Sequence, residues 1–248
     1  MQNRQFLAGL LLSIPICFLL LWFANIKCNW ANEDYKKRIW LHRANTPEKL
    51  REFAGEYDGY ECDVILRDSV FDVTHDMPVS HGIGLNPYFS FLQNTNRQLW
   101  LDIKNLTFEN KSTALNIIKT LCRDHLVNKD QLIIESNNWE ALSDFKRAGF
   151  YTSYYIPIEE INRMGLAEKE DALRLLNRIA QDKAVDAFSF YGRYYYIIKK
   201  EIYAPIDLLT WEHHHSKEVL SLLPRGRKLL QDSLVKIILV KDKGHYHK

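Results

Sequence analysis

The sequence lacks the two glycine-rich loops that most often bind nucleotides, since it contains neither GxxxxGK[ST] nor GxGxxG. Its formal net charge of +2 is small, and the lysines and arginines are scattered along the chain. The concentrated basic stripe of a nucleic-acid-binding protein is therefore missing. Hydrophobic residues make up 46% and charged residues 26% of the chain, which is ordinary for a globular protein and excludes global disorder.

Cysteine is also scarce, with four residues that form neither a CxxC pair nor a Cys/His zinc spacing. They are Cys17, Cys28, Cys62 and Cys122. We interpret them as buried or membrane-embedded free thiols. A disulfide from Cys28 to a partner chain stays open if that region faces an oxidising compartment.

An uncharged apolar run, FLAGLLLSIPICFLLLWFA, extends from Phe6 to Ala24. It approaches the roughly 20 residues that a helix needs to cross a bilayer. The run is longer than the apolar core of a typical signal peptide, and no convincing cleavage site follows it. Trp22 and Trp30 near its distal end are typical of an interfacial aromatic anchor. We therefore expect a transmembrane signal anchor over residues 1–25, followed by a polar linker over 26–37.

The orientation of this predicted anchor is less directly indicated. More basic residues follow the run than precede it, which by the positive-inside rule would place the C-terminal side in the cytoplasm. A single N-terminal span usually exports the domain on its C-terminal side, however. Glycosylation sequons at Asn105 and Asn110 are too common by chance to decide the matter. We expect a single-pass membrane protein with its C-terminal domain on the extracytoplasmic side.

Short apolar runs bounded by polar, glycine or proline residues predict nine β-strands. They are Ile39–Ala44, Tyr60–Leu66, Phe71–Thr74, Gln98–Ile103, Gln131–Glu135, Thr152–Ile156, Ala187–Phe190, Asp207–Trp211 and Lys236–Val240. Helical spacing between several of them predicts helices that begin at Thr46-Pro47 and that cover Glu109–Leu126, Trp139–Ala148 and Ile158–Gln181.

Strands that alternate with helices are typical of parallel βαβ units. About eight such units in one domain, residues 38–248, favour an α/β fold of the (β/α)8 TIM-barrel type over an open doubly wound sheet. Periodicity alone does not separate these two folds. The predicted barrel follows the N-terminal transmembrane helix.

Polar residues gather at the ends of the first strand units. The pairs are His42-Arg43, Glu61 and Asp63, His75-Asp76, and Asp102 and Lys104. Residues two apart on a strand point to the same face, so each of the two spaced pairs shares a face. One such pair alone is more often structural. The ordered set within the first third of a domain instead indicates a functional site.

Placing Glu61, Asp63 and Asp102 close together costs free energy, because like charges a few ångströms apart repel and raise one another's pKa. A divalent cation relieves this repulsion, and an all-carboxylate site suits Mg²⁺ or Ca²⁺. His42 and His75 could act as general base and general acid on a phosphate. Lys104 and Arg43 could hold its oxygens. The set therefore indicates phosphoryl-transfer chemistry.

The stretch HRANTPEKLREFAGEYDGYECDVILRDSVFDVTHD, followed by LWLDIKN, resembles the phosphatidylinositol-phospholipase-C-like phosphodiesterase superfamily. Glycerophosphodiester phosphodiesterases of that superfamily show a related HRG, ExD, HD and ExK pattern. The sphingomyelinase D branch and menorin-like proteins are similar in the ExD and DxK portions. LLTWE resembles the family's penultimate strand, which often ends with an aromatic residue over the site.

The resemblance implies a β/α barrel with its site at the C-terminal ends of the strands. It implies a role for each residue of the set: His42, His75 and Lys104 in catalysis; Glu61, Asp63 and Asp102 as ligands of Mg²⁺ or Ca²⁺; and Arg43, Lys104, Asn45 and Trp211 in substrate binding. Two departures from the glycerophosphodiesterase pattern stand out. Ala44-Asn45 replaces its metal-binding Glu-Asn, and only Met77–Asn96 separates the second histidine from the next strand unit. Both departures favour a sphingomyelinase-D-like or menorin-like site.

We therefore expect a membrane-bound, metal-dependent phosphoric diester hydrolase, or a lyase that releases a cyclic phosphate, acting on a phosphodiester or lipid headgroup and not on nucleic acid. The alternative is a non-catalytic, membrane-tethered binding module that keeps the barrel. A sugar-processing barrel that uses Glu61 and Asp63 as paired acids is less favoured, because it leaves His42, His75 and Lys104 without roles.

Overall fold

The computed structural model describes residues 33–212, 217–220 and 222–242. Within them, eight parallel strands form a closed barrel in the order β1-β9-β8-β7-β6-β5-β4-β2, and the pairing of β1 with β2 closes it. These strands are β1 (Ile39–Leu41), β2 (Gly59–Arg67), β4 (Gln98–Ile103), β5 (Leu132–Ser136), β6 (Tyr151–Tyr155), β7 (Ala187–Tyr191), β8 (Asp207–Glu212) and β9 (Val235–Val240). A further strand, β3 (Val70–Val73), pairs antiparallel with β2 as a hairpin.

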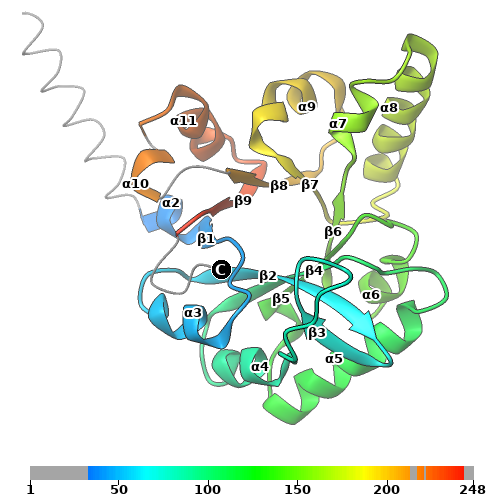
Figure 1. The fold of residues 1–248 in the computed structure, drawn as a ribbon. Helices are drawn as coiled ribbons and strands as arrows, with labels where there is room; N and C mark the ends of the chain where they lie inside the picture. The colour runs from blue at the N-terminus through cyan, green and yellow to red at the C-terminus, as the bar shows by residue number, and fades with distance from the viewer. Residues whose placement is uncertain (1–32, 213–216, 221, 243–248) are drawn as a thin grey trace, which may run out of the picture.

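Helices surround the strands on the outside, as Figure 1 shows. The α-helices are α2 (Glu33–Lys37), α3 (Pro47–Glu52), α4 (Asn86–Leu92), α5 (Lys111–His125), α6 (Ser143–Arg147), α7 (Ile158–Ile161), α8 (Leu166–Gln181), α9 (Tyr195–Glu201), α10 (Lys217–Leu220) and α11 (Pro224–Gln231), with 3₁₀ turns η1 (Lys129–Gln131) and η2 (Gly192–Tyr194). This is the TIM-type barrel that the alternation of strands and helices predicted.

All nine predicted strand segments coincide with observed strands, with ends that differ by up to three residues. The predicted cap of the first barrel helix is confirmed, since the side chain of Thr46 accepts a hydrogen bond from the backbone of Lys49. The single long helix predicted over Ile158–Gln181 is wrong: the chain leaves the helix after α7, and α8 begins at Leu166, directly after Gly165, whose backbone is extended. Part of the expected linker, Glu33–Lys37, forms α2.

The predicted anchor, residues 1–25, lies outside the described part of the chain and stays a prediction. Among residues 33–212, 217–220 and 222–242, no helix has the length and apolar character that crossing a membrane requires.

Side chains that alternate along the strands fill the barrel interior with a small apolar plug. Its buried members are Trp40, Trp100, Ile133, Ala187, Leu209, Ile237 and Leu239. Trp40 fits because its neighbour across the closing seam of the barrel is a glycine. A Cβ atom on Gly59 would lie 2.0 Å from Cδ2 of the Trp40 ring. The plug supports the side chains above it at the C-terminal ends of the strands.

Gly59→Ala is therefore expected to destabilise the protein by about 1–3 kcal/mol or more, the usual cost of overpacking a core. Gly55→Ala is the matched control, because nothing lies within 4 Å of the Cβ position at that glycine. Urea unfolding of both variants measures the difference. Equal midpoints for the two variants would contradict the tight contact between Gly59 and Trp40.

Candidate functional site

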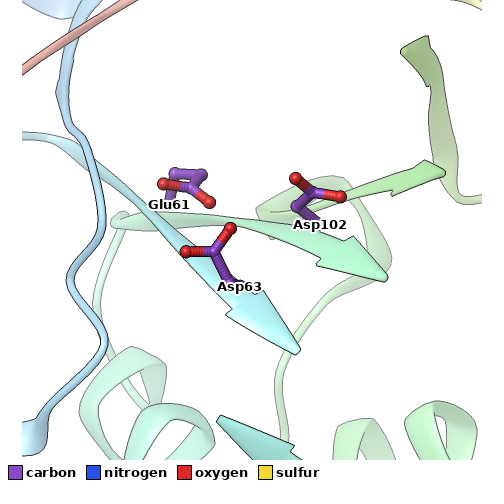
Figure 2. Close-up of side chains that lie close together, drawn as sticks. All are labelled: Glu61, Asp63 and Asp102. Atoms are coloured by element: carbon purple, nitrogen blue, oxygen red, sulfur yellow. The ribbon is translucent and has the colours of Figure 1, made fainter. Parts of the chain in front are cut away.

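Three carboxylates converge at the C-terminal ends of two neighbouring strands. Glu61 and Asp63 project from β2 on one face, and Asp102 projects from β4, where it stands directly beside Asp63 in the parallel register. One oxygen from each of the three lies within 4.8 Å of the others. Figure 2 shows the three side chains directed toward one another above the strands. Glu61 and Asp63 are almost completely buried, at 2% exposure each.

The carboxylates surround one lysine. The ammonium of Lys104 lies 2.7 Å from Oδ1 of Asp63 and also forms an ion pair with Asp102. Burial would raise the pKa of Asp63, but the charge of Lys104 and hydrogen bonds from Asn45 and Lys104 outweigh it, so that pKa is lowered. Burial, reinforced by the charge of Asp63, raises the pKa of Glu61 well above its usual value. Burial likewise raises the pKa of Asp102. The single lysine thus compensates this cluster only in part.

The loop between β1 and α3 orients two of the carboxylates. Arg43 has a left-handed backbone conformation, with φ of 54°, that is uncommon outside glycine, asparagine and aspartate. Its backbone N–H donates to Oε2 of Glu61 at 2.7 Å. The amide of Asn45 donates to Oδ2 of Asp63 at 2.8 Å, and its oxygen accepts from the backbone N–H of the same aspartate. Lys49 holds the loop by donating to the carbonyls of His42 and Arg43.

These bonds give Asn45 a clear structural task. Both ends of its amide are engaged with Asp63, so the residue positions a carboxylate. Its expected contact with substrate stays a prediction. The Arg43 side chain is more than a third exposed, with Nε 3.7 Å from Oδ2 of Asp63.

Two histidines face the same pocket from different segments. His42 follows β1, is 7% exposed, and places Nε2 3.6 Å from Oε2 of Glu61. His75 lies in the loop after β3, where Nδ1 is 2.7 Å from Oδ1 of Asp76 and the side chain is partly open to solvent. One histidine is therefore fixed in the barrel wall, and the other sits in a polar loop at the pocket mouth.

The pocket has a volume of about 220 Å³. Its lining residues are His42, Arg43, Glu61, Asp63, His75, Trp100, Asp102, Lys104, Glu135, Tyr155, Trp211 and Leu239. Every predicted site residue except Asn45 lines this pocket, and Asn45, which bonds Asp63, lines an adjoining groove of about 510 Å³. That groove shares His42, Arg43 and His75 with the pocket.

The sequence-based prediction missed four lining residues: Glu135 and Tyr155, and the plug residues Trp100 and Leu239. Glu135 lies in the strand LIIES and is only 3% exposed. The register of β4 with β5 places it beside Asp102. Burial, and then the charge of Asp102, raises its pKa well above the usual value. The signal in the sequence was a carboxylate inside an otherwise apolar strand, which is costly unless it faces a polar site.

The donor set fits a divalent cation. Mg²⁺ and Ca²⁺ bind oxygen ligands at about 2.0–2.6 Å, so two ligands of one ion are at most about 5 Å apart. The 4.8 Å limit on the oxygens of Glu61, Asp63 and Asp102 meets this requirement. Burial is the main reason that the pKa values of Glu61 and Asp102 are raised, and a bound cation would favour the ionised form of both. These three residues could hold such an ion.

No family model and no curated protein matches the sequence. Solved structures do match the fold. A putative glycerophosphoryl diester phosphodiesterase from Agrobacterium tumefaciens aligns with a TM-score of 0.61 and 14% identity, over 82% of this chain and 93% of that one. A putative glycerophosphoryl diester phosphodiesterase from Silicibacter pomeroyi aligns with a TM-score of 0.59 and 14% identity, over 84% of this chain and 92% of that one.

A phosphodiesterase from Oleispira antarctica, solved with the product sn-glycerol-3-phosphate, aligns with a TM-score of 0.56 and 12% identity, over 82% of this chain and 92% of that one. Identities this low establish the fold alone. The chain therefore shares the barrel fold of these three solved structures.

Proposed function

We propose that the protein is a metal-dependent phosphodiesterase. The observation that carries this proposal is the convergence of three carboxylates, one lysine and two histidines on a single pocket at the C-terminal ends of the barrel strands. Active sites of β/α barrels lie at this end. The structural neighbours described as phosphodiesterases support the same class of reaction. A binding module has no need for a buried cluster whose carboxylates repel one another.

Glu61, Asp63 and Asp102 would hold Mg²⁺ or Ca²⁺, which would supply positive charge to a phosphate oxygen when bound. Lys104 already lies against two of these carboxylates and is placed to contact a phosphate oxygen in the same pocket. Arg43, with a partly exposed side chain at the pocket edge, offers the forked donors that suit a phosphate. These residues bind and orient the phosphodiester.

His42 and His75 move the protons. One imidazole takes a proton from the attacking oxygen, and the other gives a proton to the departing alcohol oxygen. Water as the attacking group gives hydrolysis, and a neighbouring hydroxyl of the substrate gives a cyclic phosphate. Burial fixes the position of His42, while His75 is open to solvent and paired with Asp76.

A substrate screen tests the proposal. The full-length chain in detergent micelles is incubated with glycerophosphodiesters, phospholipids and bis(p-nitrophenyl) phosphate, with Mg²⁺ or Ca²⁺ or with EDTA. We expect turnover of at least one phosphodiester with a cation and its loss in EDTA. Turnover that persists in EDTA would contradict the metal requirement. The absence of turnover with either cation would contradict the phosphodiesterase proposal.

We also propose that the run Phe6–Ala24 anchors the protein in a membrane, with the barrel on the extracytoplasmic side. The length and uncharged character of the run support this. Protease added outside sealed, right-side-out membranes should then digest the barrel domain. A domain that stays intact until detergent is added would reverse the orientation.

A further inference from the structure

A large concavity lies at the N-terminal end of the barrel, at the opposite end from the carboxylate cluster. Its lining residues lie near the starts of β1 and of β4 to β9, or in the segments that lead into these strands. This N-terminal concavity has a volume of about 700 Å³, against about 220 Å³ for the candidate catalytic pocket. Small-molecule sites usually have volumes of about 300–1,000 Å³. None of its described lining residues is shared with the catalytic pocket or with the adjoining groove.

The floor of the N-terminal concavity is the underside of the apolar plug. Trp40, Ile133 and Ile237 of the plug line the concavity. Trp100 and Leu239 of the same plug line the catalytic pocket at the other end. The floor therefore offers apolar side chains to a ligand, and the plug separates that ligand from the candidate catalytic residues.

Four charged residues on the rim of the concavity are paired with one another. Asp186 forms an ion pair with Lys146. Asp207 accepts a hydrogen bond from the Tyr151 hydroxyl at 2.8 Å, and its other oxygen lies 3.5 Å from the ammonium of Lys236. These two lysines and two aspartates therefore compensate one another within the chain.

Two further charged residues on the rim have no ion pair among the residues that the structure describes. Lys37 ends α2, directly before β1, and Asp130 lies in η1, directly before β5, and both are exposed. In the closed barrel, β2 and β4 separate β1 from β5, so the two charges stand on different sides of the concavity. Lys236 belongs to β9, the other neighbour of β1, and so reinforces the positive side. One positive and one negative charge thus remain uncompensated across an apolar floor.

We propose that the N-terminal concavity binds a small zwitterion whose ammonium and carboxylate groups are separated by an apolar spacer. The carboxylate contacts Lys37, the ammonium group contacts Asp130, and the spacer covers Trp40 and the two isoleucines of the floor. A ligand with a single charge leaves one of the two rim residues without a countercharge, and a neutral ligand leaves both. Since pockets fix a ligand through a few polar groups around an apolar lining, this charge pattern selects the class of ligand. The site does not depend on the proposed phosphodiesterase function.

Two matched sets of ligands test the proposal. In the first set, 4-(aminomethyl)benzoate is the zwitterion, and 4-methylbenzoate and 4-methylbenzylamine carry one of its two charges on the same ring. The second set has a longer spacer and consists of 8-aminooctanoate, octanoate and octylamine. Titration calorimetry measures the Kd of each compound for the full-length chain in phosphatidylcholine nanodiscs, with empty nanodiscs as the blank. Neutral pH keeps the groups charged, and low ionic strength limits the screening of exposed charges.

In at least one set, the zwitterion should bind the wild type about three- to fivefold more tightly than either singly charged analogue. This is the upper range for an exposed ion pair, worth up to about 1 kcal/mol. Lys37→Gln removes the contact with the carboxylate, so this variant should bind the zwitterion no better than the amine. Asp130→Asn should bind the zwitterion no better than the carboxylate analogue. Lys119→Gln and Asp171→Asn are the matched controls, because these residues are exposed on the outer helices α5 and α8, and both variants should keep the wild-type preference.

Zwitterions that bind the wild type no more tightly than their analogues in both sets would overturn the proposal. A preference that survives in both Lys37→Gln and Asp130→Asn would also overturn it, because the ligand would then bind elsewhere. Asp63→Asn should keep the preference, since the carboxylate cluster lies at the other end of the barrel, and a loss in that variant would place the ligand at the cluster instead. The titrations require no turnover, so their outcome is separate from that of the substrate screen.

Discussion

Asp63→Asn is expected to lower kcat by about 10³-fold or more. A bound cation contributes on the order of several kcal/mol to the stabilisation of transition-state charge, and about 1.4 kcal/mol corresponds to a tenfold change in rate. Asp63 has one oxygen in the three-carboxylate cluster and also binds Lys104 and Asn45, so the substitution disturbs both the cation ligand and the lysine. Initial rates on the best substrate of the screen measure the loss.

The same variant should lose its thermal response to the cation. A ligand at 100 times its Kd stabilises the folded state by about 2.7 kcal/mol, so Mg²⁺ or Ca²⁺ should raise the Tm of the wild type. Glu61→Gln should lose the same response. Asp186→Asn is the matched control: Asp186 pairs with Lys146 next to the start of β6, away from the cluster. A Tm shift in Asp63→Asn as large as in the wild type would contradict the site.

The pH dependence of this shift follows from the pKa directions of Glu61 and Asp102. Burial raises both in the folded state. Above the ordinary carboxyl pKa of about 4, the unfolded chain is ionised while the folded cluster still holds protons. Without cation, their contribution to stability is therefore present below about pH 4 and is lost as pH rises toward the raised values. Because the cation binds the ionised cluster, the Tm shift should be larger at about pH 8 than at about pH 5.

His42→Ala is expected to lower kcat by about 10²–10⁴-fold, the usual contribution of a positioned acid or base. His42 is buried beside Glu61 and lines the pocket, so its loss removes a proton carrier that water does not replace in the same position. His75→Ala should show a loss of the same order. His125→Ala is the control, because that histidine lies away from the pocket and bonds Asn86 and Ser90 on α4.

The choice of leaving group in the substrate distinguishes which histidine is the general acid and which is the general base. A p-nitrophenolate departs without a proton, whereas an alkoxide requires one. The variant that lacks the general acid should therefore recover most of its rate on p-nitrophenyl esters, while the variant that lacks the general base should not. Rates within a few-fold of wild type for both variants on an alkyl ester would contradict the proposed histidine pair.

The periodicity of the sequence was sufficient to predict the strands and part of the site. Glu61 and Asp63 share a face because residues two apart on any strand do so. The same local rule paired Asp102 with Lys104. The break between α7 and α8 was missed because the apolar residues at helical spacing, Leu166 to Ile179, all lie in α8, and the extended backbone of Gly165 separates α8 from the short α7 before it. β3 was found as a strand, but its antiparallel return along β2 depends on pairing and not on periodicity.

The sequence by itself determined the order of strands and helices and the residue types at the strand ends. Only the tertiary structure decided which of them meet. The parallel register sets Asp102 beside Asp63 and Glu135 beside Asp102, and the pairing of β1 with β2 and β9 brings His42 to Glu61. Register and closure arise from contacts between residues far apart in the chain, which a local pattern does not encode.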